Sequence, residues 1–314
     1  MSESVLVGGA GVRARVAKHI VDVLIEERAP RLSRTPAWPL MRPALYGILN
    51  YSKAVRMADT VAPLAGAAAL EHISSLLRLN VEATGLERAP RDGAFLVVAN
   101  HPTGITDGIA LHDAMRGPRP DHMFYANSDA HRVCARFDDV LIPVEWVLAK
   151  RTRERTRLTL KMTGAAVEAG RPIVVFPAGR LARVRPGRNG ERGRLLDGEW
   201  MATAASLARK YNIPLLPCHV TGPWAFWFHL FDKFSKELRD MTLFHELLNK
   251  QGRTYRLKFG PLIPAEALHA DAGVATRKVK HYVESVLAHD GDAAFDPDGP
   301  ECAWRDPVPG FTQG

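Results

Sequence analysis

Short apolar runs alternate with helical patterns along most of this chain, and this alternation limits the possible folds more than any other feature of the sequence. Beyond residue 92, six runs rich in β-branched and apolar residues are candidate strands, at 94–99, 122–126, 140–144, 172–176, 213–220 and 254–259. Patterns with helical spacing stand between or after these runs, at 108–116, 153–169, 198–210 and 275–287. Strands that alternate with helices predict an α/β fold in which helices cover both faces of the sheet.

The two ends of the chain lack this alternation. Residues 1–80 predict a helical N-terminal extension, with candidate helices at 13–27, 36–51 and 58–79. Residues 290–314 are rich in proline, glycine and aspartate, which predicts a flexible acidic tail. The expected division is therefore the extension over 1–80, an α/β domain over 81–289 and the tail over 290–314.

The composition is that of a folded chain with one strongly basic segment. The 314 residues are 46% hydrophobic, which excludes a disordered protein, and the net charge is +8. Between residues 147 and 194 there are thirteen Lys and Arg against three Asp and Glu, so the positive charge is concentrated. This favours an anionic partner such as a phosphorylated metabolite, an anionic membrane surface or nucleic acid. No recognition helix or interleaved aromatic residues accompany the segment, so we expect no nucleic acid partner.

Three features bear on the cellular compartment. The three cysteines lie far apart and form no CxxC pair, which predicts reduced thiols and no structural metal. The N-terminus shows no secretory signal. The longest stretch without Asp, Glu, Lys or Arg, 211–231, contains three prolines, so we expect no continuous membrane-spanning helix there. We expect a cytoplasmic location, in which attachment to a membrane surface remains open.

A histidine and an aspartate follow the first candidate strand of the α/β domain. The segment from Ala94 to Asn100 is largely apolar, His101 opens a Pro/Gly loop, and Asp107 stands at the start of the next helical pattern. A neutral imidazole can take a proton from a hydroxyl, while a carboxylate on its other nitrogen fixes the tautomer and stabilises the imidazolium. The alternative is purely structural, with His101 in a turn and Asp107 capping the helix N-terminus.

A second candidate strand ends in a turn that presents arginines. Residues 172–176 are followed by a Pro-Ala-Gly turn and then by Arg180 and Arg183. Four more arginines stand among glycines in a segment expected to be a loop, namely Arg185, Arg188, Arg192 and Arg194. Guanidinium and backbone N–H groups in such a loop can hold a phosphate. For the four outer arginines, the alternative is a solvated loop without a ligand.

Together, the two motifs resemble those of the glycerolipid and lysophospholipid acyltransferases of bacterial membranes. The segments that carry the resemblance are Asn-His-Pro-Thr-Gly-Ile-Thr-Asp-Gly at 100–108 and Phe-Pro-Ala-Gly-Arg at 176–180. Further agreement comes from Asp-Gly-Glu-Trp at 197–200, Ile-Pro-Leu-Leu-Pro at 213–217 and Phe-Gly-Pro-Leu-Ile-Pro at 259–264. The resemblance is strongest to the hemolysin-like branch and spans roughly residues 80–264.

The resemblance implies a mixed β-sheet flanked by helices and the activity of an O-acyltransferase. A fatty acyl group would move from acyl-CoA or acyl carrier protein to the hydroxyl of a lysophospholipid or related lyso-lipid, without cofactor or metal. The implied location is the cytoplasmic face of the inner membrane. His101 would act as general base, oriented by Asp107. The implied substrate-binding residues are Thr103, Gly179, Arg180 and Arg183.

The sequence departs from the family's pattern at two positions. The usual spacing is His-x4-Asp, whereas here Thr106 stands at that position and Asp107 follows it, as in the hemolysin-like branch. Ala178 replaces the Glu of the family's Phe-Pro-Glu-Gly-Thr-Arg turn, and the arginine comes one residue early. The resemblance therefore does not fix a glycerol-phosphate acceptor. The alternative function is a non-catalytic lipid-binding or scaffolding protein on the same fold.

Six aromatic residues fall within the eleven residues from Trp224 to Phe234. Trp224, Trp227, Phe228 and Phe231 would share one face of a helix. Such a face can rest in the headgroup region of a membrane, as in a monotopic protein, or it can pack in the core or line an acyl-chain channel. The helical extension is the other candidate for membrane contact.

Overall fold

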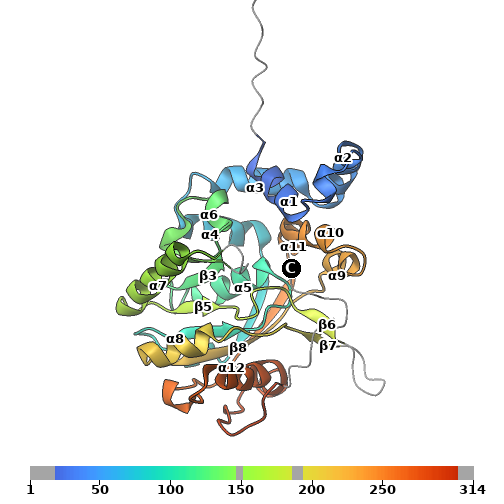
Figure 1. Ribbon diagram of the computed structural model, residues 1–314. Helices are drawn as coiled ribbons and strands as arrows, with labels where there is room; N and C mark the ends of the chain where they lie inside the picture. The colour runs from blue at the N-terminus through green and yellow to red at the C-terminus, as the bar shows by residue number, and fades with distance from the viewer. Residues whose placement is uncertain (1–17, 146–150, 186–193, 303–314) are drawn as a thin grey trace, which may run out of the picture.

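The computed structural model describes residues 18–145, 151–185 and 194–302 (Figure 1). Within these ranges the chain forms a seven-stranded sheet, in the order β1-β9-β8-β2-β5-β3-β4, and a separate hairpin of β6 and β7. The strands are β1 (Asn80–Thr84), β2 (Leu96–Ala99), β3 (Met123–Asn127), β4 (Leu141–Val144), β5 (Ile173–Val175), β6 (Arg183–Arg185), β7 (Arg194–Leu196), β8 (Leu215–Thr221) and β9 (Thr254–Phe259). Neighbours in the large sheet are parallel except β8 and β9, so the predicted mixed sheet is confirmed.

Helices cover both faces of this sheet. The helices of the described residues are α1 (Ile20–Arg28), α2 (Trp38–Ile48), α3 (Tyr51–Val61), α4 (Gly66–Leu77), α5 (Ile105–Met115), α6 (Ala130–Val133), α7 (Arg153–Glu168), α8 (Thr203–Tyr211), α9 (Phe226–Asp232), α10 (Lys236–Asp240), α11 (Leu243–Leu248) and α12 (Ala272–His281). Figure 1 shows α1, α3, α4 and α11 above the sheet and α8 and α12 below it. The α12 helix continues as one π-helical segment, Tyr282–Val286.

The side chains of the central strand β2 alternate between two hydrophobic clusters. Val97 and Ala99 belong to the cluster formed with α1, α3, α4, α5 and α11, whereas Leu96 and Val98 belong to the cluster formed with α8 and α12. Successive residues of a strand point to opposite faces, so a strand covered on both sides must be apolar throughout. Packing from both sides therefore fixes the carboxyl end of β2, where the chain continues to His101.

The helical N-terminal region expected from the sequence is present, and it packs directly on the sheet. Val21 of α1, Met57 of α3 and Leu70 of α4 lie in the same cluster as Val97 of β2. These helices therefore share one core with the α/β layers. The domain boundaries at residues 80 and 289 stay predictions.

The structure differs from the sequence expectations at three places. The helix expected over 58–79 is divided between α3 and α4 around Pro63, which lacks a backbone N–H and interrupts the helical hydrogen bonds. The strand β1 is an addition, and its residues are exposed apart from the half-buried Val81. The expected arginine loop is flanked by the paired strands β6 and β7, while residues 186–193, including Arg188 and Arg192, lie outside the described residues.

Beyond α12 the chain returns to the body of the protein. The hydroxyl of Tyr282 donates to the carbonyl of Ala293 at 2.6 Å, and Arg277 forms an ion pair with Glu301 at 2.6 Å. The amide of Cys302 donates to the carbonyl of Arg277 at 3.1 Å. The part of the predicted flexible tail up to Cys302 therefore contacts α12 and its continuation. Residues 303–314 lie outside the described residues, and flexibility stays a prediction.

The aromatic segment from Trp224 to Phe234 is divided between core and surface. Phe228 is buried, with 8% of its area exposed, whereas Trp224, Phe226 and Phe234 are 51%, 55% and 76% exposed. The residues on the expected helical face therefore do not share one environment. No helix in the described part of the chain is both long enough and apolar enough to cross a bilayer.

Where β2 ends, the side chain of Asn100 takes the place of a backbone pairing with β8. Its side-chain amide donates to the carbonyl of Val220 at 2.9 Å, and its side-chain oxygen accepts from the amide of Val220 at 2.7 Å. We expect Asn100→Ala to lower the free energy of unfolding, because each buried group left unpaired costs about 1–3 kcal/mol. Chemical denaturation measures this loss. Asn249→Ala, at an exposed position, is the control, and an equal loss in both variants would contradict the bridge.

Candidate active site

The loop between β2 and α5 is organised around the carboxylate of Asp107. Its Oδ2 accepts hydrogen bonds from the amides of Thr103 at 2.9 Å and Gly104 at 3.0 Å, and its Oδ1 accepts from the hydroxyl of Thr103 at 2.5 Å. Gly104 has a φ of 92°, a left-handed backbone that favours glycine. Asp107 therefore caps the N-terminus of α5, as the structural alternative predicts.

The same carboxylate contacts the imidazole of His101. The Nδ1 of His101 lies 3.0 Å from the Oδ2 of Asp107, which is fully buried, while the His101 side chain keeps 15% of its area exposed. The contact has hydrogen-bond length but not hydrogen-bond direction, and Nδ1 has no other partner among the residues that the structure describes. Catalytic hydrogen bonds are often poorly aligned before substrate binds. The structure therefore brings the two residues together, and capping and orienting the imidazole are compatible tasks for one side chain.

The ring of His101 and the carboxylate of Asp107 are supported by neighbouring aromatic residues. The rings of His101 and Phe176 stack at 4.3 Å between centroids. The hydroxyl of Tyr255 lies 2.7 Å from that of Thr103, and burial, followed by the charge of Asp107, raises the pKa of Tyr255. Tyr255 therefore stays protonated. The hydroxyl of Thr103 is engaged inside the protein, so its predicted contact with substrate stays a prediction.

Gly222 allows these segments to approach closely. A Cβ at this position would lie 2.6 Å from the Tyr255 ring and 2.7 Å from the Cγ2 of Thr103. The glycine immediately after β8 therefore lets Tyr255 of β9 reach the loop that carries His101.

The arginine turn after β5 lies against this loop. The amide of Gly179, which has a φ of 62°, donates to the carbonyl of Phe176 at 3.0 Å and closes the turn. The amide of Ala182 donates to the carbonyl of His101 at 2.8 Å. Because β2 and β5 are adjacent parallel strands, the loops that follow them meet at the same edge of the sheet.

The two predicted arginines have different surroundings. Arg180 is exposed, and no carboxylate in the described part of the chain lies within ion-pair distance of it. Arg183 is less exposed and lies 3.8 Å from the carboxylate of Asp232, which also binds the buried Arg239 at 2.6 Å. Burial lowers the pKa of Arg183. Arg180 is therefore better placed to bind an anion from solution.

Asp197 also touches the candidate base and was given no role in the sequence analysis. Its carboxylate oxygens accept the amide of His101 at 3.0 and 3.2 Å. The two residues lie 96 positions apart. The only signal in the sequence was the Asp-Gly-Glu-Trp segment at 197–200, which entered as agreement with a family pattern.

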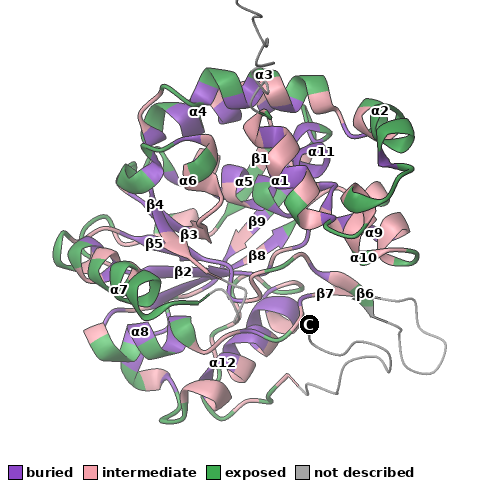
Figure 2. Ribbon diagram, turned by 45° about the horizontal axis from the view of Figure 1, so that its top comes forward, coloured by how far each residue is buried: buried purple, intermediate pink, exposed green. Residues whose placement is uncertain are grey.

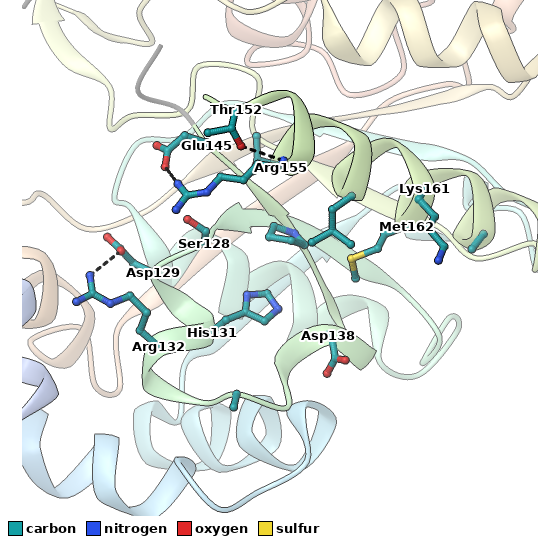
Figure 3. A pocket seen from close by; sticks show the side chains of 15 residues that line it. Ser128, Asp129, His131, Arg132, Asp138, Glu145, Thr152, Arg155, Lys161 and Met162 are labelled. Atoms are coloured by element: carbon teal, nitrogen blue, oxygen red, sulfur yellow. Dashed lines mark hydrogen bonds and ion pairs between the residues drawn. The ribbon is translucent and has the colours of Figure 1, made fainter. Parts of the chain in front are cut away.

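A cavity of about 1090 Å³ lies at the same edge of the sheet, between α6, the end of β4 and α7 (Figure 3). Both acidic and basic side chains line this cavity. Arg155 pairs with Glu145 at 2.9 Å, Arg132 pairs with Asp129 at 3.2 Å, and Lys161 is also present. None of the predicted site residues lines it. The described residues include no group of three or more side chains suited to a metal ion.

The chain is similar to known acyltransferases. Residues 80–221 match the family model described as Acyltransferase. The chain is 27% identical over 201 residues to the lyso-glycine lipid O-acyltransferase of Phocaeicola vulgatus, covering 62% of this chain and 68% of that protein. It is 24% identical over 224 residues to the same-named protein of Bacteroides thetaiotaomicron, covering 69% and 78%. The crystal structure of the 1-acyl-sn-glycerophosphate acyltransferase PlsC from Thermotoga maritima matches with TM-score 0.42 and 17% identity, over 86% and 92%.

The hydroxyl of Thr103 is expected to hold Asp107 in place. Thr103→Val removes the donor to the carboxylate at nearly unchanged volume, and we expect it to lower the free energy of unfolding by about 1.5–3 kcal/mol, as for a hydrogen bond to a charged group. Thr103→Ser keeps the hydroxyl and serves as control. Denaturant titration compares the two, and a serine variant as unstable as the valine variant would show that the methyl group, not the hydroxyl, matters.

Proposed function

We propose that this chain, which belongs to the acyltransferase superfamily and is an O-acyltransferase of the lyso-lipid type, moves a fatty acyl group from acyl-CoA or acyl carrier protein to a lyso-lipid hydroxyl. The observation that carries the proposal is the 3.0 Å contact between His101 and Asp107 at the end of β2. An imidazole that has a buried carboxylate next to its second ring nitrogen can act as the general base that deprotonates an alcohol.

In the proposed reaction, the imidazole of His101 takes the proton of the acceptor hydroxyl as the oxygen attacks the thioester carbonyl. Asp107 stabilises the imidazolium that forms. The tetrahedral intermediate then expels the thiolate, which takes the proton back from the imidazolium, so that an ester and a free thiol result. No acyl group is attached to the protein in this sequence. Arg180 would bind the anionic headgroup of the acceptor.

The acceptor in this proposal is a lyso-lipid with an anionic headgroup, and two headgroups are worth comparing. Two relatives carry the name lyso-glycine lipid O-acyltransferase. A glycine headgroup ends in a carboxylate, which a single exposed guanidinium such as that of Arg180 can bind in a bidentate manner. The replacement of the family's glutamate by Ala178 is compatible with an acceptor other than lysophosphatidate. Assays therefore offer a lyso-glycine lipid and lysophosphatidate side by side.

The deciding experiment measures release of thiol from a labelled acyl donor in the presence of these lyso-lipids. His101→Ala is expected to lower the rate by about 10²- to 10⁴-fold, the range for loss of a general base. The variant must keep the circular dichroism and melting temperature of the native chain. Full activity in such a variant would contradict the mechanism. Lipid binding without thiol release in the native chain would support the non-catalytic lipid-binding alternative.

We also propose that the protein works at a membrane surface, on the cytoplasmic face of the inner membrane. Large exposed apolar side chains occur on α2, on β6 and around α9, namely Leu40, Ile48, Val184, Trp224, Phe226 and Phe234. Figures 1 and 2 both draw α2, α9 and β6 on the right-hand side of the molecule. The ion pair between Arg183 and Asp232 joins the arginine turn to α9, so this side is continuous with the candidate site. Apolar side chains beside cations suit an interface with anionic lipids.

The surface proposal predicts weaker binding to vesicles when the exposed aromatic residues are changed. For Phe226→Asp combined with Phe234→Asp, we expect at least about a tenfold loss in sedimentation with phosphatidylethanolamine and phosphatidylglycerol vesicles, because a fully buried aromatic side chain contributes about 1.5–3 kcal/mol. Leu160→Asp on α7 is the matched control, since Leu160 is also exposed but α7 lies on the opposite side in Figure 1. Equal sedimentation of both variants would contradict the assignment.

A further inference from the structure

Three buried charged residues extend behind His101, on the side away from Asp107's helix. Asp197 follows β7, and Lys280 and Glu284 belong to α12 and its π-helical continuation. Each is between 2% and 4% exposed. Burying charged groups costs desolvation free energy, and apolar side chains of similar volume often give equal stability. This row of three buried charged residues next to one imidazole therefore points to a role other than stability.

The row is connected to His101 by hydrogen bonds. The amide of His101 donates to both oxygens of Asp197, at 3.0 and 3.2 Å, and the indole N–H of Trp200 donates to Oδ2 of Asp197 at 2.9 Å. The amide of Asp197 donates to a carboxylate oxygen of Glu284 at 2.7 Å. The other oxygen of Glu284 is bound by the ammonium of Lys280.

The carboxyl group of Asp197 is buried beside a second carboxylate, that of Glu284. Burial, followed by the negative charge of Glu284, raises the pKa of Asp197 to about 7, while the His101 and Trp200 N–H groups lower it. Lys280 balances Glu284 locally, so the row carries about one net negative charge when Asp197 is ionised. An ionised Asp197 favours the imidazolium form of His101, and the reverse effect follows by linkage.

Other groups also face His101. Asp107, on α5, lies at the imidazole nitrogen rather than at the backbone amide and also favours the imidazolium, so its contribution is common to the native chain and an Asp197 variant. Phe176, after β5, and Trp200, before α8, contribute uncharged rings. Beyond Asp197 the neighbouring charges are Glu284 and Lys280. On the turn beside the loop, Arg180 and Arg183 carry positive charge, which opposes protonation of the imidazole.

We infer that Asp197 is a positioning residue for His101, which fixes the backbone of the base and favours its protonated form, and that Lys280 and Glu284 hold Asp197 for this task. This inference deepens the proposed function, since His101 is its general base.

The test follows the protonation of His101 directly. His101 is one of twelve histidines, so its Cε1–H signal in the NMR spectrum is assigned by its loss in His101→Gln. Asp197→Asn keeps an oxygen that can accept the His101 amide but removes the charge. We expect the His101 titration to move to lower pH, because loss of a nearby opposite charge disfavours the imidazolium. An unchanged midpoint in a folded variant would overturn the inference, because a purely structural Asp197 would not move it.

A milder pair of variants keeps the test decisive if Asp197→Asn does not fold. Trp200→Phe removes the N–H that stabilises the ionised Asp197, so the His101 midpoint is expected to move in the same direction by a smaller amount. Trp38→Phe is the matched control. Trp38 is equally buried, but its indole N–H has no partner within the described ranges, so no shift is expected. No shift in Trp200→Phe, or the same shift in both variants, would overturn the inference.

Activity measurements separate this inference from the proposed function. The acid limb of the kcat/KM profile reflects the neutral fraction of the base, so in Asp197→Asn it is expected to move to lower pH together with the NMR midpoint. If the native chain shows no thioester-dependent acyl transfer while the midpoint shifts, the proposed function fails and the role of Asp197 stands. If transfer occurs and neither the limb nor the midpoint moves, the inference fails and the function stands.

Discussion

The hydrogen bonds that hold the buried carboxylate of Asp107 determine most of what this site can do. Two amides and a hydroxyl from Thr103 and Gly104 compensate its loss of water, and without them a fully buried anion would be expensive. The same bonds start α5 at Ile105 and bend the chain back toward β2. The helix cap and the partner of the candidate base are therefore one group, so the local fold and the proposed chemistry depend on a single interaction.

The sheet supplies the second constraint. Helices on both faces fix β2, and its parallel pairing with β5 brings the histidine loop and the arginine turn to one edge. The antiparallel strand β9 then places Tyr255 beneath Thr103, across the glycine at position 222. The site is thus built from three loops of distant sequence origin, and each is held by a strand with buried side chains on both faces or by a close contact that only a small residue permits.

Much of this arrangement was predictable because its signals are local. The six expected strands are present with ends shifted by two residues or fewer, since apolar runs bounded by Pro and Gly identify strands well. The strand β1 was not predictable, because Asn80–Thr84 is a polar edge strand whose partner, β9, lies far along the chain. Asp197 was missed for the same reason. A contact between an amide and a carboxylate 96 positions apart leaves no pattern in a single sequence.

Both backbone polar groups of His101 are held by hydrogen bonds. Its amide is held by Asp197, and its carbonyl accepts the amide of Ala182, two residues beyond Arg180. The arginine turn and the histidine are therefore mechanically joined, with little freedom for one to shift alone. A ligand that displaces the turn therefore also displaces the backbone of His101. Substitutions in the turn should alter affinity and turnover jointly, even where the altered side chain does not contact the acceptor hydroxyl or the thioester.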